Sequence, residues 1–206
     1  MKTPIKLKIA LQNLPHKCER TVLVPEDINM RQLHFVIQYA MGWENDHLFQ
    51  FSDLKKNATF YATMSEEPGF LDIPDRLEAY KVSLKDSFLD RFGAKPFWYK
   101  YDFGDDWLHK ISIFKVFKTD LKKYNGKPVC IEAEGKCPPE DIGGVSGYSY
   151  FLNVIRDKEH PEHYEQREWN GLEPKEHYDE FEVSLEDINE GLSDFYESYG
   201  WKDRDY

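Results

Sequence analysis

Residues 97–113 read FWYKYDFGDDWLHKISI. Aromatic residues occupy every second position from Phe97 to Phe103, and a similar alternation of ring-bearing or apolar residues runs from Trp107 to Ile113. A period of two is typical of a half-buried β-strand, and the intervening Gly104-Asp105-Asp106 supplies a turn. The stretch therefore predicts an antiparallel hairpin over residues 97–117 with an acidic tip.

The segment before this hairpin predicts two strands followed by a helix. Residues 5–11 alternate between apolar and charged or small residues, and residues 21–24 form a second apolar run that Pro25 ends. Apolar residues then recur at helical spacing over residues 30–41, and Gly42 stands where a left-handed helix stop belongs. Further strands are expected at residues 47–51 and 58–64, a loop at 65–78 and a short helix at 84–92.

The last third of the chain predicts helices. Ser146 can begin one helix, and Ser184 with Asp187 three residues later resembles a capping box at the start of another. The expected buried stripe of this final helix consists of Leu185, Ile188, Leu192, Phe195 and Tyr199. We therefore expect an α+β fold in a single domain over residues 1–206, with residues 157–206 as an acidic helical extension packed on it.

The negative charge of the protein is concentrated at the end of the chain. Of the net charge of −11, residues 157–206 carry −12, whereas residues 1–156 carry +1. Because phosphate backbones are bound through lysine and arginine, direct nucleic-acid binding is not expected. The acidic segment predicts a solvated helical face or, alternatively, a surface that meets a basic protein partner. The one basic cluster, within Lys115–Lys127, is interpreted as an exposed loop rather than a phosphate-binding patch.

The apolar runs and the cysteines of the sequence argue against a membrane protein and against a disulfide-stabilised scaffold. No apolar run approaches the roughly 18 residues that a membrane helix needs, and the charged start lacks the apolar core of a signal peptide. Three cysteines at irregular spacing do not form a disulfide framework. We therefore expect no membrane partner and a cytoplasmic location.

A second unusual segment, residues 137–148, reads CPPEDIGGVSGY. Like residues 101–109, it crowds carboxylates, glycines and aromatic rings into about a dozen positions. Ordinary cores do not need this mixture, because carboxylates are costly to bury and glycines weaken regular elements. We expect the two segments to share one location, as a site or as a demanding structural corner.

These segments and the upstream histidines supply the candidate site residues. They are His34, His47, Asp102, Asp105, Asp106, Trp107, His109, Glu140, Asp141 and Tyr148. Oxygen ligands suit Mg²⁺, Mn²⁺ or Ca²⁺, and added imidazole suits Zn²⁺ or Fe²⁺, so a divalent metal is the cofactor that such a pool could hold. The metal-ligand candidates are Asp102, Asp105, Asp106 and His109.

A structural interpretation of the same residues remains open. Asp105 and Asp106 can be turn formers that bond their own backbone, and Glu140 with Asp141 can cap a helix. A histidine on the buried side of a helix, such as His34, is more often a hydrogen-bonded core residue than a ligand. Cys130 and Cys137 are spaced too widely for an ordinary zinc knuckle, so a metal site that joins them to His109 is only weakly indicated.

The motifs together resemble the plasmid pRiA4b ORF-3-like family. The matching stretches are LHxxIQxxMGW at 33–43, HLxxF at 47–51, YDFGDDWxH at 101–109 and CPPEDxGGxxGY at 137–148. The resemblance implies an α+β fold shared by bacterial and archaeal proteins of unassigned function, some of which travel on plasmids or with insertion elements under resolvase-like labels. Relatives often carry a further cysteine where this chain has Ile142, so a shared cysteine–metal role does not carry over.

Two functional classes remain. The preferred one is a non-catalytic binding or accessory protein associated with mobile elements, because no complete catalytic set can be read from the motifs. The alternative is a metal-assisted hydrolase or nuclease that uses the carboxylates and histidines named above.

Overall fold

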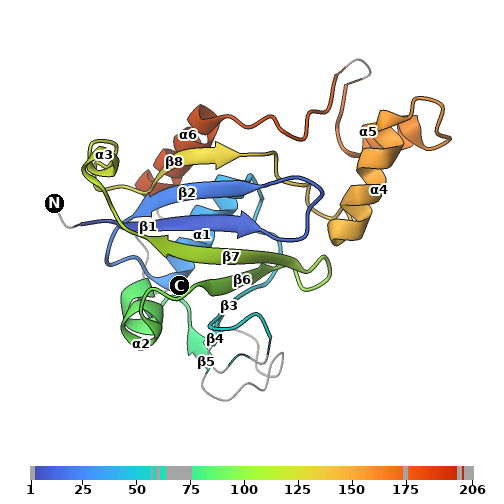
Figure 1. The fold of residues 1–206 in the computed structure, drawn as a ribbon. Coiled ribbons are helices and arrows are strands. Elements are labelled where there is room, and N and C mark those ends of the chain that lie inside the picture. Colours follow the sequence, from blue (N-terminus) through green and yellow to red (C-terminus); the bar gives the residue numbers. More distant parts are fainter. Residues whose placement is uncertain are drawn as a thin grey trace.

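The alternation in residues 5–11 produces a strand with one buried face. In the computed structural model, which describes residues 3–56, 58, 61–63, 76–173, 176–198 and 201, Leu7 and Ile9 are fully buried, whereas Lys6 and Lys8 lie on the other, partly exposed face. This strand belongs to an eight-stranded sheet in the order β5-β4-β3-β6-β7-β1-β2-β8 (Figure 1). The strands are β1 (Ile5–Leu11), β2 (Glu19–Val24), β3 (Phe49–Ser52), β4 (Tyr61–Thr63), β5 (Arg76–Glu78), β6 (Phe97–Tyr101), β7 (Trp107–Phe114) and β8 (Val129–Glu134).

The predicted hairpin lies in the middle of this sheet. Strands β6 and β7 pair antiparallel, with Phe97 opposite Ile111 and Tyr101 opposite Trp107. Strand β7 also pairs with β1, and β3 pairs with β6, so the tip of the hairpin is fixed from both sides. All neighbouring strands are antiparallel except β4 and β5, which are parallel.

The helices lie behind the sheet and beside both ends of its strands. They are α1 (Met30–Met41), α2 (Asp90–Phe92), α3 (Lys118–Leu121), α4 (Gly144–Arg156), α5 (His163–Trp169) and α6 (Leu185–Glu197), with a π-helical turn η1 (Lys85–Leu89) before α2. Figure 1 shows α1 and α6 behind the sheet, whereas α4 and α5 lie beside the tip of the β6–β7 hairpin. The predicted α+β fold class is confirmed.

Helix α1 begins and ends at residues suited to those positions. The Asn29 side chain accepts a hydrogen bond from the Gln32 amide at 2.7 Å, and the Gln32 side chain accepts one from the Asn29 amide at 3.1 Å, which is a capping box. Gly42, at φ +84°, ends the helix and donates its N–H to the Gln38 carbonyl. The apolar side of α1, including the fully buried Leu33, packs into the main core.

Several elements differ from the sequence expectations. Strand β8 is present where the sequence predicts no strand. Its local sequence did not indicate a strand, because β8 is defined by its pairing with the distant β2, which shifts register between Thr21 and Val22. The helix expected at 84–92 is the π-helical turn η1 followed by the single turn α2. Most of the loop expected at 65–78 lies outside the described residues, and β5 occupies its end.

The expected stripe of the final helix is only partly buried. Leu192 and Phe195 are buried and Ile188 packs on the core, but the Leu185 residue is 38% exposed because it lies in the first turn, at the rim of the contact. Tyr199 lies outside the described residues. Helix α6 packs against both α1 and β8. No helix in the described part of the chain is long and apolar enough to cross a membrane.

Two histidines are buried in the aromatic core. His34 lies between the Tyr99 hydroxyl, 2.7 Å from Nδ1, and the Asn45 side chain at Nε2, and its ring stacks on Phe49. His109 is fully buried, and the Trp43 ring meets it edge to face with centroids 5.3 Å apart. Burial lowers the pKa of each imidazole from 6.5 to about 3, because a charged ring loses its hydration in the core.

This burial predicts a loss of stability in mild acid. Between about pH 6.5 and pH 3 the two histidines bind protons in the unfolded chain but not in the folded protein. The free energy of unfolding therefore falls as the pH falls. Well inside this window the loss is about 1.4 kcal/mol for each histidine and each pH unit. We expect His109→Phe to remove about half of this histidine contribution, measured by urea unfolding at about pH 6 and about pH 5. His177→Gln, at an exposed histidine, is the matched control. If the unfolding free energy of the His109 variant changed with pH as much as that of the wild type, buried His109 would not be a source of the acid sensitivity.

Candidate functional site

The loop between α1 and β3 is anchored by a tryptophan. Trp43, 7% exposed, stacks its ring on Tyr101 with centroids 5.1 Å apart, and its indole N–H donates to the Pro138 carbonyl at 2.9 Å. This single side chain therefore holds the end of α1, the end of β6 and the 137–143 loop together. The residues that follow it, Glu44 to His47, are placed at the same corner.

The turn of the β6–β7 hairpin is built by its aspartates. Asp102 has φ +52° and accepts the Gly104 amide on Oδ1 at 2.8 Å, while its carbonyl accepts the Asp106 amide at 2.8 Å. Asp106 also has positive φ, which aspartate tolerates better than most residues. Its carboxylate pairs with Lys100 at 2.6 Å on the surface. Asp106 is therefore a turn former, as the structural interpretation expects.

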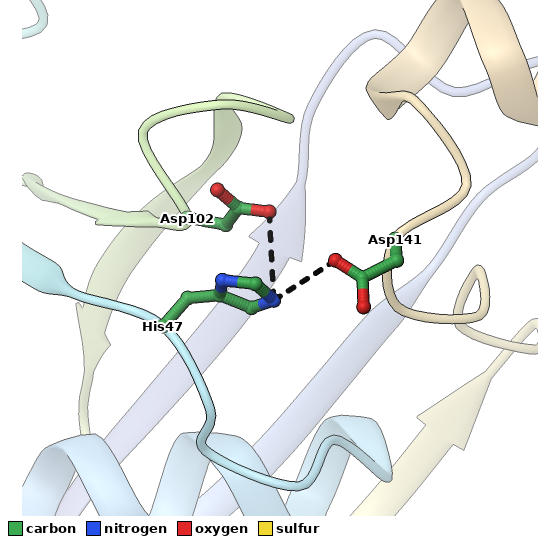
Figure 2. A group of neighbouring side chains, drawn as sticks. All are labelled: His47, Asp102 and Asp141. Carbon is green, nitrogen blue, oxygen red and sulfur yellow. Dashed lines mark ion pairs between the residues drawn. The ribbon is translucent and has the colours of Figure 1, made fainter.

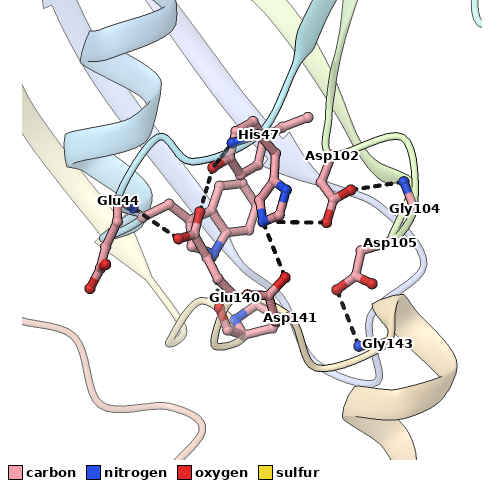
Figure 3. Close-up of polar contacts among 11 residues, drawn as sticks. Glu44, His47, Asp102, Gly104, Asp105, Glu140, Asp141 and Gly143 are labelled. Carbon is pink, nitrogen blue, oxygen red and sulfur yellow. Dashed lines mark hydrogen bonds and ion pairs between the residues drawn. The ribbon is translucent and has the colours of Figure 1, made fainter.

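The two unusual segments meet at the start of α4. The Gly143 amide donates to Asp105 Oδ2 at 3.2 Å, which ties the hairpin tip to the second segment (Figure 3). Gly144, at φ +65°, lies so close to Asp105 that an added Cβ would be 2.4 Å from the Asp105 carbonyl oxygen. Gly147 is equally constrained, because its Cβ would be 1.8 Å from the Ile142 carbonyl oxygen.

A histidine and two carboxylates converge at this corner, as Figure 2 shows. His47 Nε2 lies 3.1 Å from Asp141 Oδ1 and 3.9 Å from Asp102 Oδ2. The Nε2 atom itself is buried and has no hydrogen-bond partner in the described part of the chain. The Asp141 side chain is 70% exposed and the Asp102 side chain 11%, so the cluster opens to solvent on the Asp141 side.

A second acidic group lies next to the first. It consists of Glu44, Asp46 and Glu140, whose oxygens come within 4.8 Å of one another. Glu140 is fixed, because the Tyr101 hydroxyl donates to its Oε1 and the Glu44 amide donates to its Oε2 at 3.2 Å. Burial and the adjacent Glu140 carboxylate raise the pKa of Tyr101 above its ordinary range, so the phenol stays a hydrogen-bond donor.

The predicted site residues thus fall into two sets. His47, Asp102, Asp105, Glu140 and Asp141 are brought to one corner. The others serve the core or the surface. His34 and His109 are buried among aromatic rings, Trp107 packs against Trp43, the buried Tyr148 hydroxyl contacts that of Tyr178 at 3.1 Å, and Asp106 pairs with Lys100.

The metal-ligand set differs from the one that the sequence predicts. Of the expected Asp102, Asp105, Asp106 and His109, only Asp102 belongs to either group of potential ligands found among the described residues. His109 is excluded because it is enclosed by the core. Glu44 and Asp46 were not expected as site residues. The sequence feature that could have indicated them is the stretch Glu44-Asn45-Asp46-His47. It holds three ionisable side chains and begins two residues after Gly42, where the helix ends.

Gly144 lies against the backbone of Asp105 in the hairpin turn. We expect this contact to stabilise the folded protein. Gly144→Ala combines a strained positive φ with a clash against the backbone of Asp105, so we expect a loss of about 3 kcal/mol in unfolding free energy, measured by urea titration. Gly171→Ala is the matched control, because Gly171 has φ +68° but no atom within 4 Å of an added Cβ, and about 1 kcal/mol is expected there. Equal losses in the two variants would show that the contact with Asp105 contributes nothing.

Two known proteins that are similar to this chain carry names without an assigned function. "Uncharacterized protein y4hQ" from Sinorhizobium fredii (strain NBRC 101917 / NGR234) is 36% identical over 200 residues, which are 97% of this chain and 96% of that protein. The crystal structure of the protein of unknown function MM3350 from Methanosarcina mazei Go1 superposes with a TM-score of 0.72 at 27% identity, covering 89% of this chain and 95% of that one.

The family comparison covers both unusual segments. The model of the family described as "Plasmid pRiA4b ORF-3-like protein" matches residues 3–187, which include the corner formed by Trp43, the hairpin tip and the 137–148 segment. The match leaves out the last part of the acidic C-terminal segment. The chain belongs to the plasmid pRiA4b ORF-3-like family.

Proposed function

We propose that the protein is a non-catalytic binding or accessory protein whose site takes a divalent cation between His47, Asp102 and Asp141. The proposal rests on one observation, the buried His47 Nε2 atom that lacks a hydrogen-bond partner and lies between two carboxylate oxygens. In a neutral imidazole with the proton on Nδ1, this atom carries a lone pair. A lone pair that faces two anions is repelled by them, so a proton or a cation is needed in the space that the three atoms enclose.

The distances suit a small cation. Two ligand atoms that each lie about 2.1 Å from a metal lie roughly 3.0–3.4 Å apart at octahedral or tetrahedral angles. His47 Nε2 and Asp141 Oδ1, at 3.1 Å, meet this requirement, and Asp102 Oδ2, at 3.9 Å from Nε2, needs to approach by about half an ångström. Solvent on the exposed Asp141 side could complete the coordination. One imidazole with two carboxylates favours Mn²⁺, Fe²⁺ or Zn²⁺ over Ca²⁺.

This site predicts measurable Mn²⁺ and Zn²⁺ binding to chelator-treated protein. Asp141→Asn should weaken the affinity at least about tenfold in isothermal titration, because an amide is a poorer ligand than a carboxylate. Asparagine tolerates the φ of +57° at this position, so the fold is expected to persist. Asp106→Asn is the matched control, since Asp106 is also an exposed aspartate with positive φ but pairs with Lys100. Unchanged affinity in the Asp141 variant would contradict the proposal.

One further observation favours the alternative of a metal-assisted hydrolase or nuclease. The second group uses Asp46 and Glu140, the immediate neighbours of His47 and Asp141, so two cations could lie side by side at this corner. Paired cations activate water and stabilise the leaving oxygen in phosphoester hydrolysis. Mn²⁺-dependent hydrolysis of bis(p-nitrophenyl) phosphate that is lost in Asp141→Asn would support this alternative, whereas metal binding without turnover supports the binding protein.

The charge distribution supports the proposal that the protein does not bind nucleic acid directly. On the open face of the sheet, Lys6 pairs with Asp120 at 3.0 Å and Lys8 with Glu19 at 2.6 Å, so these lysines are not free for phosphate. Within the lysine cluster, Lys127 pairs with Glu197 of α6.

We therefore expect no gel shift of DNA at about 0.15 M salt. The exposed lysines of the cluster, Lys118, Lys122 and Lys123, are the residues to test. Tight binding that disappears when the three become glutamate would overturn this expectation, because it would identify the cluster as a phosphate-binding patch.

The remaining expectations stand as proposals. Residues 157–206 are proposed to be an acidic extension of a single 1–206 domain that meets a basic protein partner, supported by exposed carboxylates on α6 such as Glu186, Glu190 and Asp194. A cytoplasmic location is supported by three free cysteines, which persist in reducing compartments. An association with mobile elements is supported by the plasmid reading frame in the family description.

A further inference from the structure

The acidic C-terminal part of the chain contains a cavity in which positive charges gather. The cavity has a volume of about 470 Å³ and lies between the end of α4, helix α5 and residues 176–180. Residues 157–206 hold 5 lysines and arginines against 17 aspartates and glutamates. Two of the five, Lys158 and Arg167, line the cavity, as does Arg156 directly before this segment. The cavity therefore reverses the local charge, and it shares no lining residue with the candidate cation site.

Arg167 is oriented by neutral partners. Its Nη2 atom donates to the backbone carbonyls of Glu173 and Glu176, the second at 2.7 Å. Because carbonyl groups carry no net charge, these bonds fix the guanidinium without neutralising it. Its Nε and Nη1 donors remain for a ligand. Charged N–H donors of this kind form strong hydrogen bonds with phosphate and carboxylate oxygens.

The carboxylates at the cavity wall already have donors. Glu180 pairs with Arg156, and Glu176 accepts a backbone amide on Oε2 at 3.0 Å. Lys158 is exposed and forms no ion pair within the described part of the chain. Three lysine and arginine charges thus line the cavity with two carboxylates. Arg167 and Lys158 are the two cations that no described carboxylate pairs with.

A buried histidine supplies a hydrogen-bond acceptor. His163 is 6% exposed and lines the cavity, and its Nδ1 atom lies 3.1 Å from the Val154 carbonyl oxygen. A carbonyl oxygen only accepts, so Nδ1 carries the proton of this bond, and in the neutral ring Nε2 holds a lone pair. Nε2 is therefore the ring atom left for a hydroxyl group of a ligand.

We propose that this cavity binds a small organic anion that carries a phosphate or carboxylate group together with a hydroxyl group. The charged group lies against Arg167 and Lys158, and the hydroxyl donates to His163 Nε2. The cavity volume falls within the roughly 300–1,000 Å³ of small-molecule sites, so it has room for an organic ligand and not only for an inorganic ion. The proposal is independent of the candidate cation site, so either can fail without the other.

The test is isothermal titration of chelator-treated protein with glycerol 3-phosphate and with malate, which distinguish phosphate from carboxylate. We expect at least one of the two to bind, and glycerol, which lacks the charge, not to bind. Lys158→Gln should weaken the affinity at least about tenfold, because a charged hydrogen bond is lost. Lys118→Gln is the matched control and should leave the affinity unchanged, since Lys118 is an exposed lysine outside the cavity.

A second variant separates this cavity from the cation site. Asp141→Asn should bind the same anion with the affinity of the wild type, because Asp141 does not line the cavity. Loss of anion binding in this variant would place the anion at the cation site and overturn the proposal. Equal weakening by Lys158→Gln and Lys118→Gln, equal binding of glycerol, or no binding of either anion at millimolar concentration would also overturn it.

Discussion

The packing of Trp43 is the contact on which the candidate site depends. Its ring covers Tyr101 at the end of β6, and its indole N–H bonds to the Pro138 carbonyl in the second segment. An indole supplies a large apolar surface and a single directed donor, so it fixes both distance and orientation. Every ionisable residue of the loop that follows, from Glu44 to His47, is positioned relative to this one side chain.

The carboxylates around this corner have divided roles. Asp102 uses Oδ1 to bond the Gly104 amide within the turn, while its Oδ2 faces His47. Both oxygens of Glu140 accept hydrogen bonds, whereas the Asp141 side chain is 70% exposed and lies 3.1 Å from His47 Nε2 through Oδ1. The structural and functional interpretations of the acidic motifs are therefore compatible, because the same turn that consumes one oxygen aims the other at the imidazole.

Local signals explain which parts of the fold could be predicted. The β6–β7 hairpin and helix α1 follow from period, turn and cap residues, which act within a few positions in the sequence. Strand β8 could not be found this way, since its pairing with β2 is a long-range contact with an irregular register. The same limit applies to the site. The sequence named His47 as a candidate and placed the segments of Asp102 and Asp141 together. The position of His47 between these two carboxylates and the enclosure of His109 depend on how three loops pack, which the sequence does not show.

The segment from Gly135 to Gly143 carries Glu140 and Asp141 to the candidate site. It is held at Lys17 by the close approach of Gly135, at Trp43 by the Pro138 carbonyl and at Asp105 by the Gly143 amide. A segment fixed at three points loses little further entropy when its side chains engage a ligand, because most of its freedom was lost on folding. The same restraint holds Asp141 toward His47. A site of one histidine and two aspartates can therefore be preorganised on a loop, where ligand positions are ordinarily less precise than on a helix or strand.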